Sequence, residues 1–268
     1  MTWGKEEKLA VEEISGAGFE GIQFRIDATT EFKPAELKTL LAAHNLTFVA
    51  ISSGDVSIDP AVRAQIVEKH TANAKFVRDA GGLYLQVLDE LKPYPRKVSA
   101  DNAKQLGALL TELGKRTLDL GIPLAYHNHM NTISEHPENL EIVLESSDPK
   151  YVKLLLDTAH SVAGGGDPAQ AVKKYHDRIL FVHLKDVVDA SMDIPGAKYP
   201  FKWVELGRGK VNLPAVFKAL DEVNFQGWEI VELDRVPEKN GTPWESALIN
   251  RKYLEASTGA KFPPIRHG

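Results

Sequence analysis

The sequence contains no cysteine, and this absence excludes several kinds of site. Without cysteine there is no disulfide framework, no thiolate metal site and no cysteine nucleophile. Long apolar runs are also missing, because none of them approaches the ~18 residues needed to span a bilayer. Residues 1–7 lack the basic start and the apolar core of a signal peptide. We therefore expect a soluble cytoplasmic protein that has no membrane partner.

An excess of positive charge is lacking as well. The formal net charge is −5 and the pI is near 6.0, so electrostatics gives no reason to expect nucleic acid or an anionic membrane as a partner. The 268 residues are 43% hydrophobic, which is enough for one α/β barrel or for two smaller domains. Because no shift in composition marks a boundary, we expect one domain over residues 1–268.

Apolar runs typical of buried strands alternate with segments of helical pattern. This alternation is the rhythm of a parallel sheet with a helix between successive strands. No Gly-x-Gly-x-x-Gly follows the first strand, which weakens a dinucleotide-binding interpretation. The pattern predicts an α/β fold of the (β/α)8 TIM barrel type, which is typically ~250 residues long. The predicted strands are 19–25, 46–52, 83–88, 122–126, 152–156, 179–182 and 227–234, and the predicted helices are 5–16, 34–44, 60–80, 99–120, 137–146, 168–176, 213–223 and 244–256.

One of the eight barrel strands is missing from this pattern. It should precede the first helix, where only Met1-Thr2-Trp3 stand. A regular strand of five residues cannot fit before Lys5, so we expect a gap or a stub at this place. An open or distorted barrel would follow, and a barrel with this gap exposed is a candidate for homodimer formation.

Residues that bind metals or transfer protons come directly after the central strands. Because parallel strands point their carboxyl ends the same way, such residues gather on one face of a barrel. Asp157, His183 and Glu232 each end a different strand, and together they offer the oxygen and nitrogen donors that a divalent ion prefers. Alone, Asp157 would more often be a helix N-cap, and a lone histidine would more often be structural. Together they favour a site, because an ionised carboxylate in a barrel mouth needs a charge partner.

Several of these strand ends resemble the recurring motifs of the xylose-isomerase-like superfamily of sugar isomerases and epimerases. The resemblance extends from Lys5 to about Leu254, and it implies that Asp157, His183 and Glu232 hold a divalent metal, usually Mn²⁺, Co²⁺, Mg²⁺ or Zn²⁺. Tyr-His-Asn-His-Met-Asn-Thr at 126–132, with Ser-Asp-Pro-Lys-Tyr-Val at 147–152, is most similar to the inosose (2-keto-myo-inositol) dehydratase branch. The other motifs are Leu-Asp-Thr-Ala-His at 156–160, Val-His-Leu-Lys-Asp at 182–186, Gly-Arg-Gly at 207–209 and Gly-Trp-Glu-Ile-Val-Glu at 227–232.

The chain departs from the family pattern at the fourth metal ligand. Many members carry a glutamate three residues before an asparagine on the fifth strand, and counting back from Asn128 this position is Ala125. His127 lies two residues further on, and hence on the same face of the strand. We expect His127 to be the fourth ligand, or otherwise to have a supporting or substrate-binding role. A shell of two carboxylates and two imidazoles would suit Zn²⁺, Co²⁺ or Mn²⁺ better than Mg²⁺.

This ligand set indicates a reaction on an α-hydroxy-ketone or keto-sugar. The metal would polarise the carbonyl and stabilise the enediolate that forms when the neighbouring C–H loses its proton. Candidate bases for this proton are His129, His160 and Glu90, and Lys185 could hold a substrate oxygen or protonate a leaving hydroxyl. Reprotonation of the enediolate would make the protein a sugar or cyclitol isomerase or epimerase. Expulsion of a β-hydroxyl would make it an inosose-type dehydratase.

Other residues and other functions remain open at this stage. Gln23 and Asn128 are candidate substrate-binding residues, and Arg208 either binds a substrate anion or is a solvated loop residue. A non-catalytic sugar-binding barrel is an alternative of another class, favoured by Ala125 and the short amino terminus. An endonuclease of the same superfamily would need a basic DNA-binding face, against which the acidic balance argues. We expect His70 on the surface and Trp228 in the core.

Overall fold

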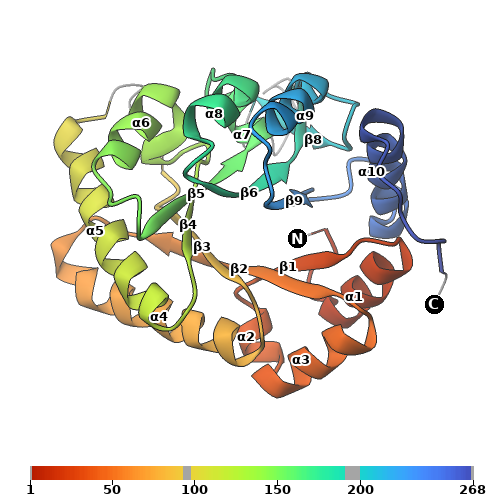
Figure 1. Cartoon of the computed structure of the whole chain (residues 1–268), viewed down its shortest axis with the longest axis horizontal. Helices are drawn as coiled ribbons and strands as arrows, with labels where there is room; N and C mark the ends of the chain where they lie inside the picture. Colours follow the sequence, from red (N-terminus) through yellow and green to blue (C-terminus); the bar gives the residue numbers. More distant parts are fainter. Residues whose placement is uncertain (1, 93–97, 191–199, 267–268) are drawn as a thin grey trace.

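The computed structural model of the chain describes residues 2–92, 98–190 and 200–266. Parallel strands within these ranges form one curved sheet of seven strands, in the order β1-β2-β3-β4-β5-β6-β9, with helices on its outside (Figure 1). The predicted (β/α)-barrel architecture is thereby confirmed. The strands are β1 (Gly21–Arg25), β2 (Thr47–Val56), β3 (Tyr84–Asp89), β4 (Leu124–His127), β5 (Val152–Asp157), β6 (Ile179–Leu184) and β9 (Trp228–Val231).

The predicted helices lie within a few residues of their expected bounds. The longest helix, Ala100–Asp119, carries both signals on which its prediction rests. Ser99 caps the first turn by accepting a hydrogen bond from Asn102 N. The apolar residues of the helix recur at helical spacing and are buried against the sheet. The helices are α1 (Glu7–Gly16), α3 (Pro34–Ala43), α4 (Arg63–Asp79), α5 (Ala100–Asp119), α6 (Pro137–Glu145), α8 (Pro168–Tyr175), α9 (Leu213–Glu222) and α10 (Pro243–Thr258).

Several short elements were not predicted from the sequence. Each has at most six residues, which is too short for a periodic pattern to show. Three of them bear on the site, because α7 starts directly after β5 and an antiparallel hairpin of β7 and β8 follows β6. These elements are α2 (Ala28–Glu31), the 3₁₀ turns Pro60–Val62 and Ile133–Glu135, α7 (Thr158–Ala163), β7 (Asp186–Asp189) and β8 (Phe201–Val204).

Two apolar layers hold the barrel together. The larger layer lies between the strands and the surrounding helices. The smaller one fills the barrel interior, where Trp228, expected in the core, is half-buried. Ala125 belongs to this inner layer and is fully buried, so its side chain faces the barrel axis as expected. The inner layer consists of Val49, Ala50, Ala125, Leu155 and Phe181, with Tyr84, Leu180, Trp228 and Ile230 packed against it.

The barrel is open between its first and last strands. In the described ranges β1 pairs only with β2 and β9 pairs only with β6. Residues 2–5 form a turn, so the predicted gap ahead of α1 is confirmed. Thr2 lies at this gap, because its hydroxyl donates a hydrogen bond to the carbonyl oxygen of Leu233. None of the helices in the described part of the chain is long and apolar enough to cross a membrane.

His70, expected on the surface, is fully buried between α4 and β2. Its Nε2 lies 3.1 Å from the carbonyl oxygen of Asp55, to which it donates, so Nδ1 accepts from the Ser53 hydroxyl at 2.6 Å. Asn73 donates in turn to the Ser53 hydroxyl at 2.8 Å. These bonds require a neutral imidazole. Burial, followed by the charge of Lys69, lowers the pKa of His70 to about 4.

The protein is therefore expected to lose stability in acid through His70. The unfolded chain takes up the proton at the ordinary pKa of 6.5, whereas the folded chain resists it down to about 4. The stabilisation is complete above pH 6.5 and declines as the pH falls toward 4, by up to about 3 kcal/mol. Urea unfolding across this range should show the decline, and His70→Gln should flatten it. An equal decline in the variant would contradict this assignment.

Candidate metal centre

Four possible ligands meet at the carboxyl ends of the strands. His127 ends β4, Asp157 ends β5, His183 is on β6 and Glu232 follows β9. Asp157 and His183 are partners in the register of β5 and β6. One donor atom from each of the four residues lies within 4.8 Å of the donor atoms of the other three. The structure thus brings together the residues that the sequence indicated as metal ligands.

The donor atoms of this group fit a divalent ion. His127 Nδ1, Asp157 Oδ2 and His183 Nδ1 are among the few buried side-chain atoms of the described residues that make no hydrogen bond. His183 Nδ1 lies 3.2 Å from Glu232 Oε2 and 3.6 Å from Asp157 Oδ2. A buried polar atom without a partner costs about 1–3 kcal/mol. A cation placed between these atoms would satisfy all of them together.

Gln23 orients one of these ligands. His183 Nε2 donates to Gln23 Oε1 at 2.8 Å, and Gln23 Nε2 donates to Gln86 Oε1 at 3.1 Å. With its proton on Nε2, the neutral imidazole of His183 presents the lone pair of Nδ1 to the centre. Gln23, which we expected to bind substrate, lines the cavity and contacts a candidate ligand, as the outer partners of metal-binding histidines do.

Asn128 has a comparable effect on Asp157. Asn128 Oδ1 accepts from Asp157 N at 2.8 Å, and Asn128 Nδ2 donates to Asp157 O at 3.3 Å. Both ends of the amide are therefore bound to the backbone of Asp157, at the end of the next strand. Asp157 Oδ1 accepts from His160 N at 2.8 Å and caps α7. The cap uses one carboxylate oxygen and leaves Oδ2 to the centre.

The charges of the centre favour exchange of a proton for a metal ion. Burial, the largest effect, opposes a charge on His183, but the carboxylates of Glu232 and Asp157 outweigh it and raise the pKa of His183 to about 9. Burial and the neighbouring His183 hold the pKa of His127 well below its ordinary value. A metal ion would displace the proton from His183, so the affinity of the centre for the ion should fall as the pH falls.

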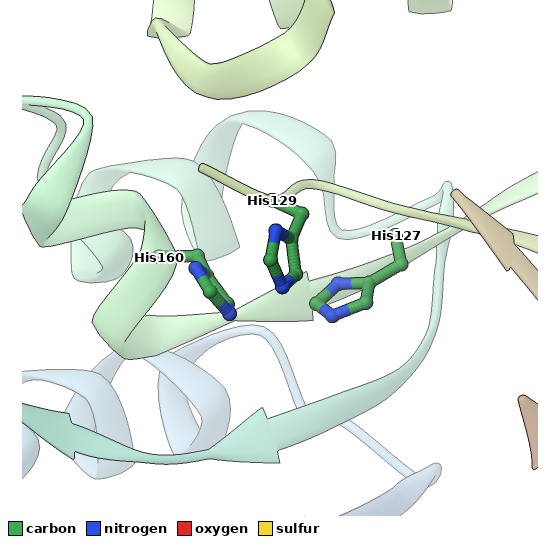
Figure 2. A group of neighbouring side chains, drawn as sticks. All are labelled: His127, His129 and His160. Atoms are coloured by element: carbon green, nitrogen blue, oxygen red, sulfur yellow. The ribbon is translucent and has the colours of Figure 1, made fainter. Parts of the chain in front are cut away.

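Three histidine rings converge beside these ligands (Figure 2). His129 and His160 have ring centroids 3.7 Å apart with ring planes tilted by 34°, and the His127 ring lies 5.4 and 5.6 Å from them. His129 Nδ1 donates to Met130 O at 2.7 Å, which leaves the Nε2 lone pair as a base. Burial and then the Lys185 charge lower the pKa of His129. One donor atom of each of these three histidines lies within 4.8 Å of those of the other two, so the rings form a second group that could hold an ion.

Lys185 is enclosed by carboxylates and rings, with a side chain only 1% exposed. Its Nζ lies 2.9 Å from Glu232 Oε2, 3.0 Å from Asp234 Oδ2 and 3.4 Å from His160 Nε2. It also stands 4.6 Å from the centre of the Trp203 ring. Burial opposes the ammonium charge, but Glu232 and Asp234 outweigh it and raise the pKa of Lys185. The lysine is thus a charged ammonium group held beside the candidate ligands.

Comparison with known proteins places this chain in a family. The sequence matches a family described as xylose isomerase-like TIM barrel over residues 11–252. The chain belongs to this family. It is 33% identical over 166 residues to an inosose dehydratase of Lacticaseibacillus casei, which covers 59% of this chain and 55% of that protein. The match thus spans about half the length of that relative.

Two further relatives of this xylose isomerase-like barrel span almost all of it. An inosose dehydratase of Clostridium beijerinckii is 27% identical over 279 residues, covering 96% of this chain and 92% of that protein. Among solved structures, the IOLI protein with a binding zinc atom superposes with a TM-score of 0.76 at 20% identity, covering 94% of this chain and 92% of that one. At this level of identity the superposition shows a shared fold.

Glu90, a candidate base, is not brought to the centre of this barrel. Its carboxylate pairs with Lys92 at 2.8 Å, and this hydrogen bond lowers the pKa of Glu90. The preceding Asp89 is buried instead, where it accepts from Tyr126 Oη at 2.5 Å and Ile133 N at 2.7 Å. Burial raises the pKa of Asp89 to about 6. Through these two hydrogen bonds Asp89 holds Tyr126 and Ile133 in place, at the two ends of the segment that carries His129.

Arg208 also lies away from the centre, paired with Glu205 at 3.0 Å and half-exposed. The glycines on either side of it have a structural role in the xylose isomerase-like barrel. The backbone N–H groups of Gly207 and Gly209 donate to Asp186 Oδ2 at 3.0 and 2.9 Å. The Gly-Arg-Gly motif therefore closes a loop on the buried carboxylate of Asp186.

The Gly209→Ala variant is expected to be destabilised by more than about 2 kcal/mol, the range of clashes in a packed interior. A Cβ at this position would stand 2.1 Å from Asp186 Oδ1, so the loop or the carboxylate would have to move. Lys210→Ala is the control, because its ion pair with Asp189 is exposed and such a pair contributes at most about 1 kcal/mol. Urea unfolding measures both variants, and equal midpoints would show that the loop tolerates the added methyl group.

A cavity of about 690 Å³ connects the centre with the open side of the barrel. Its inner end is lined by candidate ligands and acid–base residues, and its outer part is lined by residues of β1, β9, α1 and α10, whose places in the barrel Figure 1 shows. Asp234 and Trp203, which the sequence did not single out, complete the surroundings of Lys185. The inner lining comprises Gln23, His127, His129, His183, Lys185 and Glu232.

Proposed function

We propose that this chain is a divalent-metal-dependent dehydratase that acts on a keto-cyclitol such as 2-keto-myo-inositol. The observation that carries the proposal is the placement of four candidate ligands beside buried acid–base residues at one end of a single cavity. The relatives named inosose dehydratase support the class of substrate. Isomerisation or epimerisation through the same enediolate is the alternative that the experiment below separates.

Asp157, His183 and Glu232 would hold the ion, with His127 as the fourth ligand. When bound, the ion would polarise the carbonyl of an α-hydroxy-ketone and stabilise the enediolate. Two imidazoles in the shell favour Zn²⁺, Co²⁺ or Mn²⁺ over Mg²⁺.

His129 is the residue best placed to remove the proton next to the carbonyl. It lines the cavity, and its Nδ1 is committed to Met130 O, so Nε2 is the free acceptor. Its lowered pKa keeps the ring neutral and ready to accept a proton at neutral pH. The His160 ring packs against it, with the two ring centroids 3.7 Å apart.

Lys185 is the residue best placed to donate a proton to the leaving hydroxyl. Its ammonium group lines the same cavity and lies within 3.4 Å of His160 Nε2. In the elimination, the C–H proton passes to His129, the C–O bond at the β-carbon breaks, and the hydroxyl leaves as water with a proton from Lys185. Asp234 would remain as a counter-ion of Lys185 if Glu232 turned to the metal.

The experiment incubates the Zn²⁺-, Co²⁺- or Mn²⁺-loaded protein with 2-keto-myo-inositol in H₂O and in D₂O and analyses the product by mass spectrometry. Loss of one water that depends on the metal supports the proposal. Uptake of deuterium without loss of water would instead assign an isomerase or epimerase. Binding of the ketone without either change would assign a non-catalytic sugar-binding barrel.

A further inference from the structure

Lys185 lies between two carboxylates, and only one of them belongs to the candidate metal centre. Its Nζ donates to Glu232 Oε2 at 2.9 Å and to Asp234 Oδ2 at 3.0 Å. Glu232 is one of the four candidate ligands, whereas Asp234 is not among these four. Lys185 thus has one partner that the metal centre needs and one that it does not need.

Glu232 cannot serve the lysine and a metal ion equally well. The same oxygen that accepts from Lys185, Oε2, lies 3.2 Å from His183 Nδ1, the nitrogen that points to the centre. An ammonium group beside this oxygen competes with an ion for its lone pairs, and two cations this close in a buried site repel each other strongly. For Glu232 to bind a divalent ion, Lys185 must give up this contact.

Asp234 is the group to which Lys185 can turn. The two other groups close to its Nζ are His160 Nε2 at 3.4 Å and the Trp203 ring at 4.6 Å, and neither brings a negative charge. An ammonium group in the interior needs such a charge as its partner. Asp234 Oδ1 is one of the few buried side-chain atoms of the described residues that make no hydrogen bond. The Asp234 carboxylate therefore has an oxygen left to accept from the lysine.

We propose that Asp234 is a positioning residue that draws Lys185 away from Glu232 and thereby raises the affinity of the centre for a divalent ion. This inference rests on the proposed function, because it takes Glu232 as a metal ligand. Lys185 would remain at the cavity, which it lines together with Glu232. Asp234 would then set how tightly the ion is held without being a ligand itself.

The test compares Asp234→Asn with the unmodified protein in a titration with Co²⁺, followed by the visible absorption of the bound ion. This measurement needs no substrate and no turnover. We expect the affinity to fall by roughly tenfold or more, because removing one partner of a buried charge pair has a large effect. Asp189→Asn is the control: it removes one negative charge from an exposed pair with Lys210 and should bind Co²⁺ like the unmodified protein.

A second pair of variants, Lys185→Met and Lys185→Met/Asp234→Asn, shows whether Asp234 acts through the lysine. Without the ammonium group Asp234 has nothing to position, so both variants should bind Co²⁺ equally tightly. The double variant leaves neither charge of the pair buried alone, and so it keeps the test valid if Asp234→Asn does not fold.

Two results would overturn the inference. An unchanged affinity in Asp234→Asn would show that Lys185 leaves Glu232 without help. A tenfold loss on adding Asp234→Asn to Lys185→Met would make Asp234 a ligand. If Asp157→Asn lowers the affinity while Asp234→Asn does not, the inference fails and the proposed function stands. If the unmodified protein binds no Co²⁺, both fail.

Discussion

The Asp157→Asn variant is expected to lose its divalent ion and, with it, activity on the keto-cyclitol by on the order of a thousandfold or more. Asparagine keeps the oxygen that caps α7 through His160 N, so the fold should be preserved. It removes the negative charge from the buried atom that lacks a partner, Oδ2. Elemental analysis measures the bound metal, and a steady-state assay measures the activity.

Asp167→Asn is the matched control for this variant. Asp167 is an exposed cap that accepts from Ala169 N and Gln170 N at the start of α8, and asparagine caps helices as well as aspartate does. Its metal content and activity should equal those of the unmodified protein. If Asp157→Asn bound metal with unchanged affinity, the ion would have to lie elsewhere.

The second prediction with a large expected effect distinguishes the role of His127 from that of His129. We expect His127→Ala to weaken metal binding, because it removes one of the four converging donors. His129→Ala should retain the metal and lower kcat by roughly 10²–10⁴, the contribution of a positioned general base. Metal titration and kinetics on the same two preparations measure both quantities.

Other results in these two variants would assign other roles to His127 and His129. Full metal occupancy in His127→Ala, with loss of metal in His129→Ala, would make His129 the ligand. Full occupancy in both variants with lost activity would leave three residues to hold the ion and assign the His-Asn-His segment to the substrate. Because His183 must lose its proton to bind the ion and its pKa is raised to about 9, metal affinity of the unmodified protein should decline as the pH falls below about 9.

The sequence was sufficient to predict the barrel and the gathering of Asp157, His183 and Glu232. Each of these residues ends an apolar run too short for anything but a strand, and parallel strands leave their carboxyl ends on one face. His127 could be placed because side chains two residues apart share a strand face. These inferences need only local periodicity, which a sequence contains.

The predictions and the structure differ at residues whose position depends on the register of a strand or on a contact with a residue distant in sequence. Asp89 and Glu90 are adjacent carboxylates at a strand end, and a shift of one residue exchanges the inner side chain for the outer one. Trp203 reaches Lys185 from a hairpin too short to be recognised. His70 could have been placed correctly, since it shares the helical spacing of Val67 and Ala74 on the buried face of α4.

The bond between Gln23 and His183 connects the open edge of the barrel to the metal centre. β1 has one neighbour in the sheet, so it is among the strands expected to open locally with the least free energy. An ion at a hundred times its dissociation constant stabilises the state that binds it by about 2.7 kcal/mol. Trypsin cleavage after the exposed Arg25, at the end of β1, should therefore slow when metal is added and recover with a chelator. In Gln23→Leu the metal should no longer change the rate of cleavage. The rate of proteolysis at the β1 edge of the unmodified protein would therefore report whether the candidate metal centre holds an ion.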